Sequence, residues 1–128
     1  MKLLLDTHTA LWLFNEHEKL SSNARDSILD EKNVLYISIV SAWEIAIKNS
    51  LGKLGEFKGG TKVFLAAVNN SPIELLPVKR EHVLLVETLP FIHRDPFDRM
   101  LIATAVSEHM SIVTTDENIK KYDVSIVW

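Results

Sequence analysis

The stretch Lys2-Leu3-Leu4-Leu5-Asp6 opens the chain with an uninterrupted apolar run that ends at an acid. Such a run predicts a strand that is buried on both faces, because a strand with one solvated face would alternate apolar and polar residues. The following residues, Thr7–Phe14, are an apolar segment that begins with a threonine, which predicts a capped helix. A buried strand followed at once by a helix favours an alternating α/β fold.

The alternation continues to the end of the chain. We expect helices near residues 21–30, 41–51, 63–70, 80–88, 98–106 and 118–122, with Ser41 or a neighbour capping the second of these. Further strands are expected at residues 34–38, 73–78, 111–115 and 125–127. We therefore predict a three-layer α/β/α sandwich with a mainly parallel sheet of four to five strands. The length of 128 residues fits a single domain over residues 1–128.

The composition excludes several classes of site. The chain has no cysteine, so disulfides, thiolate zinc sites and cysteine nucleophiles are ruled out. No apolar run approaches the roughly 20 residues of a membrane span, and the N-terminal run is too short for a signal peptide, so we expect a cytoplasmic protein without membrane contact. The net charge of −3 argues against a nucleic-acid binder, because such proteins usually carry an excess of basic residues. The charge is compatible with nucleic-acid binding if the acids converge on metal ions.

Four acids are expected to meet at one edge of the sheet. Asp6 and Asp116 end strands, Glu44 follows the second strand within a helix, and Asp98 opens the helix that leads into the fourth strand. Functional groups of parallel α/β sheets collect beyond the carboxyl ends of the strands. The mutual repulsion of the four carboxylates at this edge would be destabilising unless cations lay between them. Oxygen donors suit Mg²⁺ or Mn²⁺, and such ions support phosphoryl transfer.

Each acid also has a purely structural interpretation. An aspartate after a strand can cap the next helix, and Glu44 can pair with Lys48 four residues later. Asp98 lies where the helix dipole favours any acid, and Asp95, before Pro96, can fix a turn. The functional interpretation is favoured because all of these structural explanations would have to fall at one edge independently.

Other polar residues are candidates for supporting roles. The histidines are either metal or phosphate ligands or ordinary structural residues, the hydroxyls either orient acids or cap helices, and the lysines either guide RNA or form solvated surface. These candidates are His8, His93, Thr7, Ser41, Thr114, Thr115, Lys48, Lys53, Lys58 and Lys62. The three tryptophans are expected in the core.

Four segments stand in a specific order and spacing. They are Leu-Leu-Leu-Asp-Thr-His (3–8), Ser-Ala-Trp-Glu-Ile-Ala-Ile-Lys (41–48), His-Arg-Asp-Pro-Phe-Asp-Arg-Met-Leu-Ile-Ala (93–103) and Ile-Val-Thr-Thr-Asp (112–116). Together they resemble the PIN-domain family, and most of all its VapC-type toxin branch. The resemblance covers nearly the whole chain, and its specificity lies in the combination of all four segments.

The resemblance implies an endoribonuclease that depends on Mg²⁺ or Mn²⁺ and cuts RNA with a metal-activated water. The family's catalytic and metal-binding acids carry over to Asp6, Glu44, Asp98 and Asp116. The segment departs from many relatives because Ile102 follows Asp98 by four residues rather than three, so Asp95 is a further candidate ligand. The resemblance also implies a homodimer and a cognate antitoxin that plugs the active site.

Two other function classes compete with this hypothesis. Phosphatases with an aspartate nucleophile also open with a strand ending in Asp, but they need a second Asp two residues later, where this chain has His8. A non-catalytic PIN-like regulatory or binding module would have no use for four mutually repelling acids. The metal-dependent ribonuclease is therefore preferred.

Apolar segments beyond the core predict association. Trp12-Leu13-Phe14 and the face from Phe64 to Val68 offer more apolar surface than one small sandwich readily covers, which favours a two-fold homodimer. An antitoxin would then bind separately as an amphipathic helix in a groove, with a basic side chain reaching into the acidic site.

Overall fold

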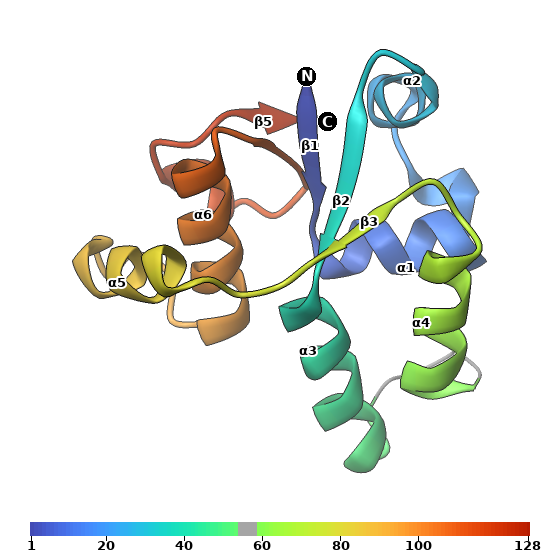
Figure 1. Cartoon of the computed structure of the whole chain (residues 1–128), viewed down its shortest axis with the longest axis horizontal. Coiled ribbons are helices and arrows are strands. Elements are labelled where there is room, and N and C mark those ends of the chain that lie inside the picture. Colours follow the sequence, from blue (N-terminus) through green and yellow to red (C-terminus); the bar gives the residue numbers. More distant parts are fainter. Residues whose placement is uncertain (54–58) are drawn as a thin grey trace.

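Five parallel strands form one sheet, with β1 (Lys2–Leu5) at its centre (Figure 1). The computed structural model describes residues 1–53 and 59–128. The strand order is β3-β2-β1-β4-β5, and every neighbouring pair is parallel. The other strands are β2 (Val34–Ser38), β3 (Glu74–Leu76), β4 (Ser111–Val113) and β5 (Ile126–Val127). The predicted parallel sheet is confirmed, although β3 and β4 end earlier than expected.

The apolar run of β1 is buried on both faces, as the sequence predicts. Leu3 and Leu5 belong to one hydrophobic core cluster and Leu4 to the other, and all three are fully buried. This split follows from the alternation of side chains along a strand. The central strand therefore anchors two separate cores, one on each face of the sheet.

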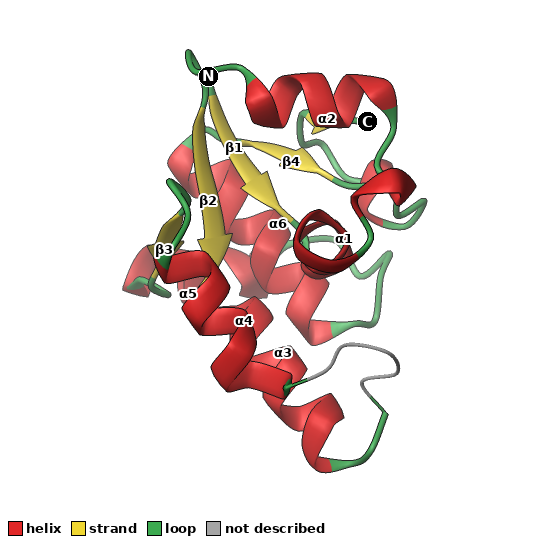
Figure 2. Ribbon diagram, turned by 90° about the vertical axis from the view of Figure 1, so that its right-hand side faces the viewer, coloured by secondary structure: helices red, strands yellow, loops and turns green. Residues whose placement is uncertain are grey.

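Helices cover both faces and give the predicted three layers (Figures 1 and 2). The core containing Leu3 and Leu5 is completed by α1 (Thr7–Asn15), α2 (Ser22–Leu29), α3 (Ile39–Ser50) and α4 (Gly60–Asn69). The core containing Leu4 is completed mainly by α6 (Pro96–Glu108), on which α5 (Arg80–Thr88) packs. Two short 3₁₀ helices, η1 (His17–Lys19) and η2 (Ile119–Lys121), complete the described elements.

The loops that matter for function lie where the strands end. In Figure 2, β1 and β2 point in the same direction and lead toward α1 and α3. Asp6 is the N-cap of α1, while Ser38 caps α3 by accepting a hydrogen bond from the Val40 backbone N–H at 3.0 Å. A cap at Ser41 is therefore wrong: Ser38 already has the extended backbone of an N-cap, so the helix begins three residues earlier.

The surface that the sequence assigned to a dimer is largely core. Phe64 and Val68 are buried, and the ring of Phe14 meets that of Phe64 edge-on with centroids 6.0 Å apart. The apolar face of α4 points at the sheet, so the expected exposed face from Phe64 to Val68 does not exist. The expectation of buried tryptophans fails at Trp43, whose exposed fraction is 58%.

None of the helices within residues 1–53 and 59–128 combines the length and the apolar character that crossing a membrane requires.

The burial of Phe64 yields a stability prediction. Phe64→Ala should lower the free energy of unfolding by about 3–5 kcal/mol, because it removes a fully buried ring and leaves a cavity. Val63→Ala, at the half-exposed neighbouring position, should cost less than about 0.5 kcal/mol. Urea denaturation measures both. Equal small losses for the two variants would mean that Phe64 is a surface residue after all.

Candidate active site

The four acids selected from the sequence lie at the carboxyl edge of the sheet. Asp6 directly follows β1, Glu44 lies in the helix after β2, and Asp116 lies in the loop after β4. Asp98 is in the first turn of α6 and feels the negative charges of both Asp6 and Glu44. The strands β2, β1 and β4 are neighbours in the sheet, which is why segments so distant in sequence meet here.

Asp6 is buried and held at both carboxylate oxygens. Its Oδ1 accepts a hydrogen bond from the Thr9 backbone N–H at 2.8 Å, and its Oδ2 accepts one from the Thr114 hydroxyl. Burial raises the pKa of Asp6, although the hydrogen bonds from Thr114 and Thr9 oppose the rise. The capping role that a structural interpretation assigns to Asp6 is thus real, and it coexists with a buried charge in the acidic group.

Glu44 is also buried, with its carboxylate bound at both oxygens. Thr7 Oγ1 donates to Oε1 at 2.8 Å, and Lys48 Nζ lies 2.6 Å from Oε2. The hydroxyl of Ser41 is 2.9 Å from Thr7 Oγ1. Since Thr7 has one hydroxyl hydrogen and gives it to Glu44, Ser41 donates in turn to Thr7. The expected pair with Lys48 exists, but it is anchored on a buried carboxylate rather than on a solvated helix face.

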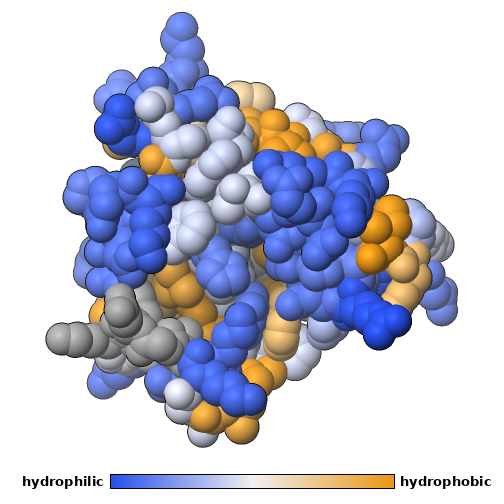
Figure 3. Space-filling model, turned by 180° about the vertical axis from the view of Figure 1, so that it is seen from behind, coloured by the Kyte–Doolittle hydropathy of each residue, from blue (hydrophilic) through white to orange (hydrophobic). Residues whose placement is uncertain are grey.

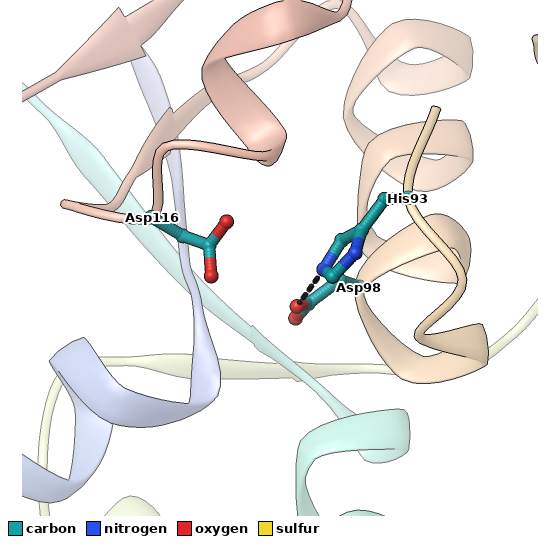
Figure 4. A group of neighbouring side chains, drawn as sticks. All are labelled: His93, Asp98 and Asp116. Carbon is teal, nitrogen blue, oxygen red and sulfur yellow. Dashed lines mark hydrogen bonds and ion pairs between the residues drawn. The ribbon is translucent and has the colours of Figure 1, made fainter. Parts of the chain in front are cut away.

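His93, Asp98 and Asp116 form the tightest group of potential metal ligands among the described residues (Figure 4). One ligand atom from each lies within 4.8 Å of the others. His93 Nε2 is 2.8 Å from Asp98 Oδ2. Figure 4 shows the three side chains turned toward one another from the loop before α6, from α6 itself and from the loop after β4.

Asp116 is oriented by its own loop. Its Oδ1 accepts hydrogen bonds from the backbone N–H groups of Asn118 at 2.8 Å and Ile119 at 3.0 Å. Its backbone N–H donates to Thr114 Oγ1 at 3.0 Å, the same hydroxyl that donates to Asp6. Thr114 therefore fixes the acids that follow β1 and β4 relative to each other.

The pKa of Asp98 reflects its burial and the acidic residues around it. The pKa of Asp98 is raised to about 7: burial contributes most, and the charges of Asp95, Asp6 and Glu44 add to the rise, against the hydrogen bond from His93. A carboxyl group whose pKa is raised toward neutral pH by burial and by like charges is typical of functional sites. A cation bound among these acids would favour the charged carboxylate and reverse the shift.

Asp95 has a different place from the four acids. Its Oδ1 accepts a hydrogen bond from the Asp98 backbone N–H at 3.0 Å, which makes it the N-cap of α6 before Pro96. The structural role of Asp95 is therefore to cap a helix, where the sequence suggested that it fixes a turn. Of the other candidates, His8, Lys53 and Lys62 are exposed, and Lys58 lies outside the described residues.

Sequence reasoning missed a clamp that holds the loop carrying His93. Arg99, which is 9% exposed, donates from Nη1 to the Pro90 carbonyl at 3.0 Å and to the Tyr122 hydroxyl at 3.1 Å. Tyr122 donates to the Pro90 carbonyl at 2.8 Å and accepts from the His93 backbone N–H at 2.9 Å. An arginine in a charged motif gives no sequence signal of a partner 23 residues away.

The donor set fits a divalent cation. The group whose ligand atoms lie within 4.8 Å of one another combines carboxylate oxygens of Asp98 and Asp116 with an imidazole nitrogen of His93, while Asp6 and Glu44 lie at the same edge of the sheet outside this group. Carboxylates suit Mg²⁺ and Mn²⁺, and a thiolate, which would favour zinc, is absent from the sequence.

Comparison with known families decides the relationship. The family model of the PIN domain matches residues 3–125. This chain belongs to the PIN domain family. Comparison with curated protein sequences gave no significant match.

Solved structures with the same fold span nearly the whole PIN chain. VapBC2 from Rickettsia felis, bound to a promoter DNA fragment, aligns with a TM-score of 0.72 at 16% identity, covering 98% of this chain and 97% of that one. DNA-bound VapBC from Salmonella typhimurium gives 0.68 at 19%, with coverages of 98% and 96%. FitAcB from Neisseria gonorrhoeae gives 0.62 at 18%, with coverages of 97% and 95%. At these identities the likeness establishes the fold.

The raised pKa of Asp98 predicts a pH-dependent stability in chelator-treated protein. Because the folded-state pKa near 7 lies above the ordinary value of 3.8, the protonated carboxyl group of Asp98 favours the folded state at low pH. This stabilising contribution is lost as the pH rises through 7. Asp98→Asn has no charge to lose. Its Tm should exceed that of the wild type at pH 8 by more than at pH 5, as measured by differential scanning calorimetry. Comparing the two proteins cancels the titration of other groups, and a difference independent of pH would contradict the assignment.

Proposed function

We propose that this PIN domain is a metal-dependent endoribonuclease and the toxin of a toxin–antitoxin pair, similar to the VapC type. The observation that carries the proposal is the crowding of buried acids around Asp98, whose carboxyl group faces both His93 and Asp116. The proposed catalytic and metal-binding residues are Asp6, Glu44, Asp98 and Asp116, and the proposed cation is Mg²⁺ or Mn²⁺. The VapBC and FitAcB likenesses agree with this assignment at the level of the fold.

When bound, a divalent cation would neutralise charge on a phosphodiester and activate a water for attack. The protein's own contribution is to fix the ligands in advance. Thr9 and Thr114 hold Asp6, Thr7 and Lys48 hold Glu44, and the turn at Asn118 holds Asp116. Preorganised ligands avoid the cost of reorientation at the moment of reaction.

The local sequence disfavours an aspartyl phosphatase. The position two residues after Asp6 is an exposed histidine rather than an acid. A non-catalytic module is disfavoured because it would retain the destabilising burial of Asp6 and Asp98 without using it.

The choice of RNA as substrate rests on the VapC resemblance and agrees with the charge around the site. Two basic residues stand beside members of the site: Lys48 pairs with Glu44, and Arg94, which follows His93 in the chain, is exposed. A polyanion can approach a bound cation past these basic residues despite the net charge of −3. Action on RNA would take place in the cytoplasm, where a toxin of this type meets its substrate.

The protein partners we propose are a cognate antitoxin and a second copy of this chain. The segments first expected at the dimer interface are core or half-buried, so another surface must serve. A groove of about 680 Å³ between α3, α5 and α6 is bordered by the exposed apolar side chains of Ile39, Trp43, Val78 and Phe91. On the face shown in Figure 3, hydrophilic surface predominates and apolar atoms form separate patches. We assign the groove to the homodimer.

Loss of one acid should abolish cleavage while the fold is retained. Asp98→Asn and Asp6→Asn should each lower the rate of single-stranded RNA cleavage in Mg²⁺ or Mn²⁺ by at least about 100-fold, because a neutral amide binds the cation weakly. Asp26→Asn, in an exposed part of α2, is the matched control and should leave the rate unchanged. Gel analysis of labelled RNA measures the rates. Full cleavage by Asp98→Asn, or by the wild type in excess chelator, would overturn the proposed function.

The homodimer has its own test. Trp43→Lys places a charge in the groove and should convert a dimer into a monomer of 14.5 kDa in light scattering at micromolar concentration. Leu29→Lys, a similar change at an exposed position of α2, should leave the dimer intact. A wild-type mass near 14.5 kDa that stays constant over a tenfold rise in concentration would refute the dimer.

A further inference from the structure

We propose that His93 is a direct nitrogen ligand of the cation in this site, and that it gives the centre a preference for Mn²⁺ over Mg²⁺. The inference rests on the proposed function and extends its metal site beyond the four acids. It starts from a feature of this chain's own geometry: the imidazole lies on the acidic edge and faces the carboxylate of Asp98 (Figure 4).

The spacing of the ligand atoms suits an octahedral ion. Bonds of about 2.1 Å place adjacent ligands about 3 Å apart and opposite ligands about 4.2 Å apart. His93 Nε2 and Asp98 Oδ2 are 2.8 Å apart, close to the adjacent spacing. The atoms offered by His93, Asp98 and Asp116 lie within 4.8 Å of one another. Small side-chain adjustments would therefore bring all three around one cation.

The hydrogen bond between His93 and Asp98 marks the place of the cation. One proton lies between two groups that both coordinate divalent metals in proteins. A cation held there would take the place of this proton, with Nε2 of His93 and the carboxylate of Asp98 as its ligands.

The backbone of His93 is fixed, which a ligand requires. The Tyr122 hydroxyl accepts hydrogen bonds from the backbone N–H groups of Ile92 at 3.2 Å and His93 at 2.9 Å. Buried Arg99 binds the same hydroxyl, and its Nη2 donates to the Val86 carbonyl at 3.1 Å. The side chain of His93 is 14% exposed, so its ring lies at the rim of the site rather than in bulk solvent.

The metal preference follows from ligand chemistry. Mg²⁺ is a hard ion that binds oxygen and gains little from imidazole, whereas the affinity of nitrogen ligands for first-row transition ions rises from Mn²⁺ onward. A site made only of Asp6, Glu44, Asp98 and Asp116 would offer oxygen alone. The imidazole of His93 is thus the group that separates the two ions.

The direct test is pulsed electron paramagnetic resonance of Mn²⁺ bound to the full chain. The wild type should show the ¹⁴N coupling of a directly bound imidazole, and His93→Gln should lose it. His8→Gln is the matched control, because His8 follows Thr7 in α1 and lowers the pKa of Asp6 through its charge. This variant should keep the ¹⁴N coupling. Calorimetric titration should show that His93→Gln weakens Mn²⁺ binding at least about tenfold and Mg²⁺ binding less than about threefold.

The outcomes separate the inference from the function beneath it. Mn²⁺ binding by the wild type without ¹⁴N coupling, or with a coupling that survives in His93→Gln, would overturn the role of His93 and leave the acidic metal site standing. Equal loss of both ions in His93→Gln would show that the histidine only orients Asp98, which also overturns the inference. Absence of any Mn²⁺ binding to the wild type would overturn the proposed function together with it.

Discussion

Carboxylates that repel one another lie at the carboxyl edge of the sheet, and the rest of the fold has to offset this repulsion. A parallel sheet with β1 between β2 and β4 brings Asp6, Glu44, Asp98 and Asp116 to one edge of the sheet. Burial and like charge together raise the pKa of Asp98 to about 7. A protein tolerates such an arrangement when stability elsewhere offsets it, and here two cores on opposite faces of β1 provide that stability.

Hydroxyl groups make this edge a rigid arrangement. Thr114 binds Asp6 through its hydroxyl and accepts from the backbone of Asp116, and Thr7 connects Glu44 to Ser41. On the other side of the site, Arg99 and Tyr122 fasten the loop that carries His93. The orientation of these side chains is therefore fixed by contacts within the folded chain, as the preorganised metal site that we propose requires.

The sequence was sufficient for the fold and for the place of the acids at one edge of the sheet, because both follow from local patterns. An apolar run ending in Asp6 predicts a buried central strand, and strand ends meet at one edge by topology alone. Contacts between distant side chains left no such pattern. Composition and periodicity do not specify how helices face their neighbours. This packing determines the burial of Phe64, the exposure of Trp43 and the hydrogen bond from Arg99 to the Pro90 carbonyl. The hydrogen bond between His93 and Asp98 joins residues five apart in sequence. It forms only because the chain between them folds so that the histidine side chain faces the acid.

Anomalous diffraction from crystals grown with Mn²⁺ locates the ion without assuming its ligands. We expect an anomalous peak about 2.2 Å from the Asp98 carboxylate, within reach of Asp6 and Asp116, at Mn²⁺ concentrations that support RNA cleavage. A peak confined to surface carboxylates far from Asp98, or no ordered Mn²⁺ at such concentrations, would contradict this expectation.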